Sequence, residues 1–315
     1  MLVAQFPMAE PHTARPHGAA PARRRGFLAF CVALSALIAT LLLHPFAAVA
    51  DRRPTTSGTP DVRPAAVPSR AVPSPAADAP AGGGASALVG GIPERTYARL
   101  LAAGTPIRCG AGTEPLVALT FDDGPGELTR QTVRLLRERG MTGTFFLVGK
   151  LLDEARFQGL PALTADLGAV GNHTWDHVAM ARASASELQE QIARTRRAIA
   201  GEVGERIVLF RPPLGARDRQ LDAYVRSLGM LTILWSIESG DSQGASADRI
   251  FRAVRASLSP GDIVLLHENR GTTQRALPRI LDLIEARGYT TVTVPELLAS
   301  DPPTRGQLRA GTCPA

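Results

Sequence analysis

The sequence predicts an α/β domain built on a parallel β-sheet that closes, or nearly closes, into a barrel. Short apolar runs alternate with amphipathic stretches through residues 91–315, as in successive βα units. The runs lack the apolar–polar alternation of half-buried strands, so we expect the strands to be buried on both faces. No glycine-rich dinucleotide fingerprint is present, which favours a βα barrel over an open Rossmann sheet.

Strands and helices are expected to follow one another in order. The expected strands are residues 116–121, 144–148, about 167–171, 207–210, 230–235, 262–267 and 289–293. The expected helices are residues 127–139, Ser184 to about Ala200, 217–228, 246–258 and 274–287. Ser184 and Glu187 have the spacing of a capping box, and the helix ends are marked by Gly140, Gly201, Gly229 and Gly288.

An export segment is expected at residues 1–50. A basic stretch ends at Arg25, residues 27–43 carry no charge, and Ala48 and Ala50 form a small-residue cleavage site. This order is typical of a signal peptide that is cleaved after Ala50. The apolar run is long for a signal and short for a membrane span, so an uncleaved anchor is the alternative.

Residues 51–90 are expected to be a flexible linker. They are rich in Pro, Ala, Ser, Thr and Gly and show no apolar periodicity, so they cannot bury enough apolar surface to offset the entropy of ordering. Residues 91–315 remain for one large domain.

The net charge of +6 does not indicate nucleic-acid binding. The leader holds half of the excess, Lys150 is the only lysine, and no basic block follows residue 25. We therefore expect no nucleic-acid partner and a membrane link only through the leader. An anionic cell envelope is the expected electrostatic partner.

Two of the three cysteines flank the predicted domain. Cys31 lies in the apolar leader, whereas Cys109 and Cys313 remain after cleavage. In an oxidising compartment such a pair predicts one disulfide, and two free thiols are the alternative.

Unusual polar residues follow five of the predicted strands. They are Asp122 and Asp123 after the first strand, His173 and His177 after the third, Arg211 after the fourth, Glu238 and Asp241 after the fifth, and His267 at the end of the sixth. The carboxyl ends of barrel strands meet on one face, so these residues are expected to line a single cleft.

This combination of side chains predicts a catalytic metal site. Two histidines four residues apart project the same way if their loop makes a helical turn, and imidazoles suit Zn²⁺ and related metals. One aspartate would complete three ligands and leave a position open for water. The other aspartate would act as a base that an arginine holds in a bidentate grip, and His267 would serve as the acid.

The same residues resemble the motifs of the NodB-type polysaccharide deacetylases, carbohydrate esterases that remove N- or O-acetyl groups from glycans. The motifs TFDDGP, HTWDH, RPPLG, ESGDS and LLH occur in order, and the resemblance covers about residues 114–297. It implies a distorted (β/α)7 barrel.

The resemblance also implies individual roles. Asp122 would be the general base, held by Arg211, and Asp123, His173 and His177 would bind Zn²⁺ or another divalent metal such as Co²⁺ or Ni²⁺. The remaining implied roles are an oxyanion contact from Leu214, substrate contacts from Trp235 and Leu265, and a general acid, His267, paired with Asp241. Glu238 and Ser242 depart from the fourth motif, and Glu238 is the rival partner of His267.

The expected function is removal of acetyl groups from an N-acetylated polysaccharide outside the cell membrane. Peptidoglycan N-acetylglucosamine is the nearest such substrate. The alternatives are an O-acetyl xylan esterase, a chitin-oligomer deacetylase and a non-catalytic glycan-binding envelope protein. The sequence leaves the oligomeric state open.

Overall fold

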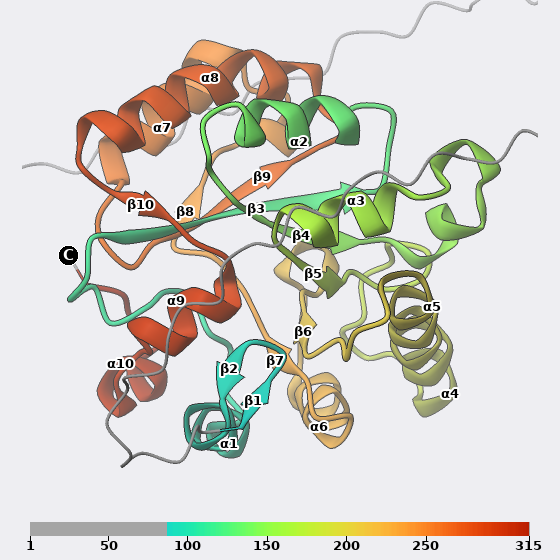
Figure 1. Ribbon diagram of the computed structural model, residues 1–315. Helices are drawn as coiled ribbons and strands as arrows, with labels where there is room; N and C mark the ends of the chain where they lie inside the picture. Colours follow the sequence, from blue (N-terminus) through green and yellow to red (C-terminus); the bar gives the residue numbers. More distant parts are fainter. Residues whose placement is uncertain (1–86, 315) are drawn as a thin grey trace, which may run out of the picture. The chain divides into compact units, whose positions relative to one another are not determined.

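A curled parallel sheet forms the centre of the protein. The structure is a computed structural model that describes residues 87–314. The eight-stranded sheet has the order β7-β6-β5-β4-β3-β9-β8, and β10 pairs with the start of β3 (Figure 1). The strands are β3 (Leu116–Gly124), β4 (Thr144–Leu147), β5 (Ala169–Asn172), β6 (Leu209–Phe210), β7 (Leu231–Thr232), β8 (Ile237–Glu238), β9 (Ile263–His267) and β10 (Thr290–Thr291).

The two strands at the edges of this sheet, β7 and β8, follow each other closely in the sequence. We expected one strand at residues 230–235, but only β7 lies in that range and pairs with β6, and a second strand, β8, follows beyond it and pairs with β9. Between them, the Ile233 N–H donates to Phe210 O at 2.8 Å and the Ser236 N–H donates to Ile263 O at 3.0 Å. The segment therefore bonds to both sides of the curled sheet, which agrees with the expected distorted barrel.

Helices cover the sheet on both sides. Helices α2, α7 and α8 lie on one side of β3 and β9, whereas α9, α10 and the hairpin of β1 (Leu88–Val89) and β2 (Ile92–Pro93) lie on the other (Figure 1). The helices are α1 (Glu94–Ala103), α2 (Thr129–Arg137), α3 (Leu160–Leu167), α4 (Ala185–Leu188), α5 (Arg194–Val203), α6 (Arg219–Ser227), α7 (Ala247–Ser257), α8 (Gly271–Ala286), α9 (Val294–Ser300) and α10 (Arg305–Ala310).

The predicted helix after Ser184 is longer than expected and contains an irregular turn. The capping box of Ser184 and Glu187 is present, and a π-helical turn at Gln189–Ala193 separates α4 from α5. Gly201 does not end the helix, because the helix continues to Gly204, whose left-handed φ of 71° forms the C-cap. A glycine can occupy a helix interior, so its position alone did not locate the end.

The domain begins slightly earlier than the composition indicated. β1 (Leu88–Val89) pairs with β2 (Ile92–Pro93), although we expected residues 88–90 to belong to the linker. The predicted leader and the rest of the predicted linker lie outside the described residues. Within residues 87–314, no helix is long and apolar enough to cross a membrane.

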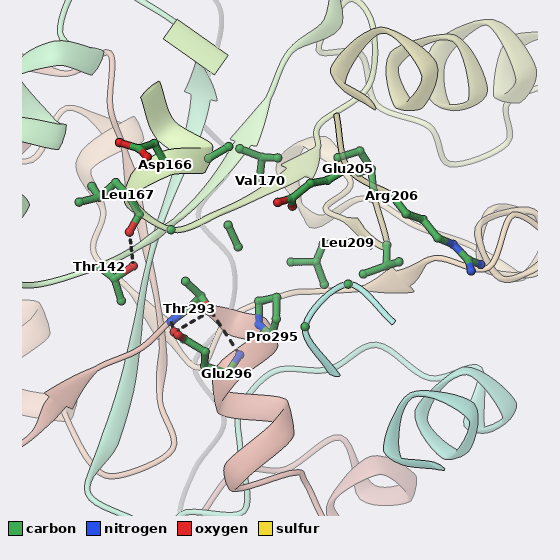
Figure 2. Close-up of a pocket in the computed structure, with 17 residues that line it drawn as sticks. Thr142, Asp166, Leu167, Val170, Glu205, Arg206, Leu209, Thr293, Pro295 and Glu296 are labelled. Carbon is green, nitrogen blue, oxygen red and sulfur yellow. Dashed lines mark hydrogen bonds between the residues drawn. The ribbon is translucent and has the colours of Figure 1, made fainter. Parts of the chain in front are cut away.

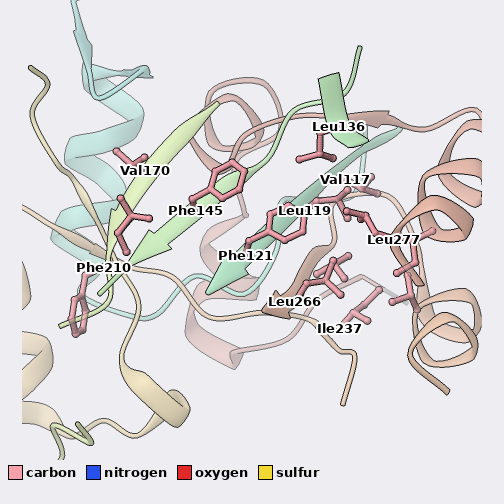
Figure 3. Close-up of a cluster of buried hydrophobic side chains, with 14 of the residues drawn as sticks. Val117, Leu119, Phe121, Leu136, Phe145, Val170, Phe210, Ile237, Leu266 and Leu277 are labelled. Atoms are coloured by element: carbon pink, nitrogen blue, oxygen red, sulfur yellow. The ribbon is translucent and has the colours of Figure 1, made fainter. Parts of the chain in front are cut away.

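The core is apolar on both faces of the sheet. Phe121 of β3 stacks on Phe145 of β4 with their ring centroids 5.2 Å apart (Figure 3). Val117 and Leu119 belong to the same cluster, whereas Ala118 packs into a second cluster on the opposite face. Burial on both faces explains why the sequence of β3 lacks a polar alternation.

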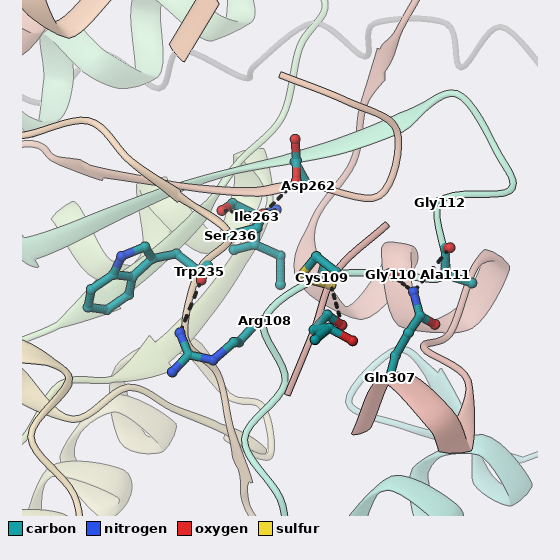
Figure 4. The surroundings of a disulfide bond; sticks show 12 residues. Arg108, Cys109, Gly110, Ala111, Gly112, Trp235, Ser236, Asp262, Ile263 and Gln307 are labelled. Atoms are coloured by element: carbon teal, nitrogen blue, oxygen red, sulfur yellow. Dashed lines mark hydrogen bonds between the residues drawn. A yellow bond between two sulfur atoms is a disulfide. The ribbon is translucent and has the colours of Figure 1, made fainter. Parts of the chain in front are cut away.

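A disulfide joins the two flanks of the domain. Cys109 and Cys313, 204 positions apart, are bonded to each other (Figure 4). The buried carboxylate of Asp301 fastens the same region, because it accepts hydrogen bonds from the backbone of Gly112 and from the Thr113 hydroxyl.

Candidate active site

The strand ends bring the predicted polar residues together. Asp122 and His267 are direct neighbours in the pairing of β3 with β9. His173 follows β5, and Arg211 follows β6, which pairs with β5. Residues that are far apart in the sequence therefore meet at the carboxyl edge of the sheet.

Asp123, His173 and His177 form a three-residue group that could hold a metal ion. One ligand atom from each lies within 4.8 Å of the others. Asp123 Oδ1 is 3.1 Å from His177 Nε2 and 3.7 Å from His173 Nε2. This oxygen is buried, and no hydrogen bond from the described residues satisfies it. An unsatisfied carboxylate oxygen facing two imidazole nitrogens fits a divalent cation.

The histidine loop does not make the helical turn that we expected. Thr174 and His177 both have left-handed backbones, with φ of 67° and 58°. His173 and His177 nevertheless reach the same place, and their ring centroids are 5.0 Å apart.

Hydrogen bonding sets the tautomer of His173. Its Nδ1 lies 2.7 Å from the carbonyl oxygen of Arg211, which can only accept, so Nδ1 carries the proton and Nε2 presents its lone pair to Asp123. Burial lowers the pKa of His173, although the nearby Asp122 and Asp123 oppose this effect. The ring is therefore neutral, as a metal ligand requires.

Asp123 is ionised in spite of its burial. Burial alone would raise its pKa, but the contact with His177 and the neighbouring imidazole groups of His173 and His267 hold the pKa of Asp123 well below its usual range. An anionic oxygen beside two imidazole nitrogens supplies three donor atoms for a cation.

Arg211 fixes Asp122 through one hydrogen bond rather than the bidentate grip that we expected. Its Nη1 donates to Asp122 Oδ1 and to Thr120 Oγ1, each at 2.8 Å. The other nitrogens donate to the carbonyl oxygens of Ile233 and Leu234, so those donors are not available to the carboxylate. The Arg211 side chain is fully buried, so the guanidinium and the Asp122 carboxylate keep one relative orientation.

His267 pairs with Asp241 and not with Glu238. His267 Nδ1 lies 2.7 Å from Asp241 Oδ1, and the His267 backbone N–H donates to Oδ2 at 2.7 Å. The Thr273 hydroxyl donates to the same Oδ2 at 2.6 Å. Glu238 is exposed and accepts from the N–H of Gly240.

Three further predicted residues belong to segments that carry Arg211 or His267, or that contact Arg211. Leu214 has a left-handed backbone, with φ of 59°, and its side chain is 80% exposed. The ring of Trp235 is half-buried beside Gly215, where a Cβ would lie 3.1 Å from the indole. Leu265 is buried in β9, two residues before His267.

Glu268, which follows His267 directly, was not predicted from the sequence. Its carboxyl group is fully buried, and neither oxygen has a hydrogen-bond partner among the described residues. It packs so closely against Gly124 that a Cβ there would lie 1.3 Å from Oε1. Burial, with smaller effects of Asp123 and Asp122, raises the pKa of Glu268 to about 8. The sequence feature that could have indicated a role for Glu268 is its position directly after a predicted strand.

A separate cavity of about 410 Å³ opens at the amino-terminal ends of β5 and β6, beside α9 (Figure 2). Its lining among the described residues includes none of the predicted site residues. Glu296 in its wall is already used, because it forms the capping box of α9 with Thr293. The cavity is therefore distinct from the strand-end group.

Comparison with known proteins agrees with this geometry. The family model described as polysaccharide deacetylase matches residues 110–233. A peptidoglycan N-acetylglucosamine deacetylase of Bacillus cereus is 34% identical over 195 residues, which cover 59% of this chain and 89% of that protein. The chain belongs to the polysaccharide deacetylase family. Other relatives that match are named a bifunctional xylanase/deacetylase, a bifunctional xylanase/xylan deacetylase and a chitooligosaccharide deacetylase.

The lengths of these polysaccharide deacetylases differ. A peptidoglycan N-acetylglucosamine deacetylase of Listeria monocytogenes is 32% identical over 189 residues, which are 59% of this chain but only 40% of that protein. The chain thus spans less than half the length of this relative.

Two solved structures of carbohydrate esterase family 4 have the same fold. A family 4 carbohydrate esterase from Streptomyces lividans, in complex with acetate, has a TM-score of 0.54 and 32% identity, covering 60% of this chain and 98% of its own. A family 4 pseudoenzyme from Bacillus anthracis has a TM-score of 0.58 and 26% identity, covering 62% of this chain and 69% of its own. Because the family includes a pseudoenzyme, catalysis has to be argued from the site residues.

Proposed function

We propose that the protein is a metal-dependent deacetylase that hydrolyses the N-acetyl groups of a polysaccharide, with N-acetylglucosamine of peptidoglycan as the substrate. The observation that carries this proposal is the unsatisfied Asp123 Oδ1 between His173 and His177, with the Asp122 carboxylate beside it. The site has a place for a cation, a separate base and a separate acid, and an acetyl-transfer site without a covalent nucleophile needs all three.

Asp123, His173 and His177 would hold the metal. When bound, a divalent ion such as Zn²⁺ acts as a Lewis acid toward a carbonyl oxygen and lowers the pKa of water. His173 is already in the tautomer that ligation needs, because its Nδ1 is bonded to the Arg211 carbonyl.

Asp122 is the proposed general base. Its Oδ1 is held by Arg211, whereas its Oδ2 lies 3.6 Å from His173 Nε2, at the edge of the metal group. Oδ2 can therefore accept the proton of a water that attacks the acetyl carbon. The exposed turn at Leu214 would present a backbone N–H to the resulting oxyanion.

His267 is the proposed general acid. Asp241 holds its Nδ1, so Nε2 is the atom that can give a proton to the departing amine. The proton taken by Asp122 and the proton given by His267 together convert one amide and one water into an amine and acetate. Asp241 stabilises the protonated ring that this step requires.

The substrate assignment rests on the names of the relatives and on the predicted export segment. We propose that the domain acts outside the membrane, where peptidoglycan is the nearest polymer with N-acetyl groups. A xylan O-acetyl esterase would use the same residues, and a glycan-binding protein without activity would keep the fold.

The test is to incubate the purified protein with Zn²⁺ and to measure released acetate. The substrates are peptidoglycan, N-acetylglucosamine oligomers and acetylated xylan, and the control is the His173→Ala variant. Acetate from peptidoglycan or the oligomers, with none from the variant, supports the proposal. Acetate from xylan alone identifies an O-acetyl esterase, and bound metal without acetate from any substrate identifies a non-catalytic protein.

A further inference from the structure

The segment between the two histidines of the metal group is fastened by one side chain from a neighbouring helix. The backbone N–H groups of Trp175 and Asp176 both donate to Gln191 Oε1, at 3.0 and 2.9 Å. Gln191 Nε2 donates in return to Asp176 Oδ2 at 2.9 Å. One amide therefore holds two of the N–H groups between His173 and His177, and backbone N–H groups of the turn at Gly149–Asp153 bind two carbonyls of the same segment.

This segment needs support from outside because its backbone is unfavourable. Thr174 and His177 are non-glycine residues in the left-handed region, a conformation that costs free energy for residues with a side chain. They persist only where the surroundings determine them. Gly149 contributes to this fit, since a Cβ there would lie 2.4 Å from the Trp175 ring.

The π-helical turn places Gln191 against the segment. Gln191 is buried, and its backbone carbonyl accepts from the Thr195 hydroxyl at 2.8 Å. In the same turn, the Ile192 carbonyl accepts from Asn172 Nδ2 at 2.8 Å, and Asn172 Oδ1 accepts from the Thr174 N–H at 2.9 Å. Irregular π turns of this kind often occur at functional sites.

We propose that Gln191 is a positioning residue of the metal centre, which sets the separation and direction of His173 and His177 before the metal binds. This inference rests on the proposed function, because it takes the two histidines as ligands. Residues that orient metal ligands typically change metal affinity by about 10–100-fold when they are replaced. Loss of Gln191 should therefore weaken metal binding more than it slows the loaded enzyme.

The experiment compares Gln191→Leu with the matched control Gln189→Leu, since Gln189 is an exposed residue of the same π turn. Binding of Zn²⁺ and Co²⁺ is measured by competition with a chromogenic chelator. Hydrogen exchange of the Trp175 and Asp176 amides is measured in the metal-free protein. We expect about 10–100-fold weaker binding and faster exchange for Gln191→Leu only, with turnover recovering at saturating metal.

Two results separate this inference from the proposed function. If the parent protein binds neither metal, the proposed function fails. If the parent binds metal and Gln191→Leu binds it equally well, the positioning role of Gln191 is wrong and the proposed function stands.

A second pair of variants tests the same contact without an apolar replacement. Gln191→Glu keeps an acceptor for the two N–H groups but sets a carboxylate against Asp176 Oδ2, so metal binding should weaken. Adding Asp176→Asn restores a donor to that contact and should recover the affinity. A double variant that binds metal no better than Gln191→Glu would overturn the inference.

Discussion

The adjacent aspartates of β3 have different neighbours, and their replacements should fail differently. Asp122 is bonded to Arg211, whereas Asp123 faces the two histidines. We expect Asp122→Asn to keep its metal and to lower turnover by about 10²–10⁴-fold, because only the base is lost. Asp123→Asn should lose metal affinity. Metal content and turnover, measured on the same samples, check both expectations; equal metal binding in the two variants would contradict this division of roles.

Asp241 should control the pH dependence through His267. Burial lowers the pKa of His267, but the hydrogen bond to Asp241 and the charges of nearby carboxylates outweigh it, so the pKa is raised. The acid form is needed, and activity is lost as the pH rises through this pKa. Asp241→Asn should move the alkaline limb of the kcat/KM profile to lower pH. Glu238→Gln should leave that limb unchanged, since Glu238 contacts Gly240 instead.

Glu268 should make the stability of the metal-free protein depend on pH. Its pKa is raised to about 8 from an ordinary 4.5, mainly by burial. The folded state then holds a proton that the unfolded chain releases, so the free energy of unfolding falls as the pH rises between about 5 and 8. Glu268→Gln lacks this proton and should gain roughly 3–5 kcal/mol relative to the parent across that range.

Urea unfolding of both proteins at the two ends of the range checks this expectation. A constant difference between parent and variant would mean that Glu268 does not hold a proton in the folded state. Because the carboxyl contacts Gly124 next to Asp123, the measurement must be made without metal.

Residues of the site differed in how well the sequence predicted them. Asp122, Asp123, His173 and His177 could be predicted because their motifs follow successive predicted strands, although each motif alone is common in turns and on surfaces. Glu268 and Gln191 act through burial and contacts with distant segments, and a buried glutamate or glutamine cannot be distinguished from an exposed one in a single sequence. The predicted bidentate grip failed for a related reason: the strand-end carbonyls that occupy Arg211 were not predictable.

At the scale of elements, the two glycines at the end of α5 provide a matched pair. Gly201 lies inside the helix, and a Cβ there would meet nothing within 4 Å. Gly201→Ala should raise the free energy of unfolding by about 0.5–1 kcal/mol, because the unfolded chain loses freedom. Gly204→Ala should lower it by about 1–2 kcal/mol, since φ is 71° there. Thermal unfolding of both variants measures whether each substitution stabilises or destabilises the protein. Equal effects of the two substitutions would contradict the helix end that we assign.

Element order was easier to predict than element boundaries. The parallel strands from residue 116 onward were expected from their apolar runs, and β3, β4 and β9 lie close to the predicted ranges. The short β7 and the separate β8 after it were not expected, because pairing first with β6 and then with β9 is decided by sheet closure rather than by local sequence. Hairpin β1–β2 was missed because its composition resembles the linker before it.

At the scale of the whole molecule, the disulfide should contribute to stability. Cys109 and Cys313 close a loop of 204 positions, for which the chain-entropy model gives about 5 kcal/mol. Cys109→Ser combined with Cys313→Ser should therefore lower the unfolding midpoint in denaturant. Non-reducing peptide mapping of the parent should recover the linked peptides. Alkylation of both cysteines in the native protein would show that the bond is not formed.

The same bond also determines how the domain would respond to mechanical load. A pulling force applied before residue 109 and after residue 313 passes directly from Cys109 to Cys313 through covalent bonds. The chain between them, including every residue of the candidate site, would carry no tension until the bond is reduced. In single-molecule stretching, the oxidised domain should therefore not show the long increase in length that accompanies unfolding of the sheet. A reducing agent should restore that increase in length.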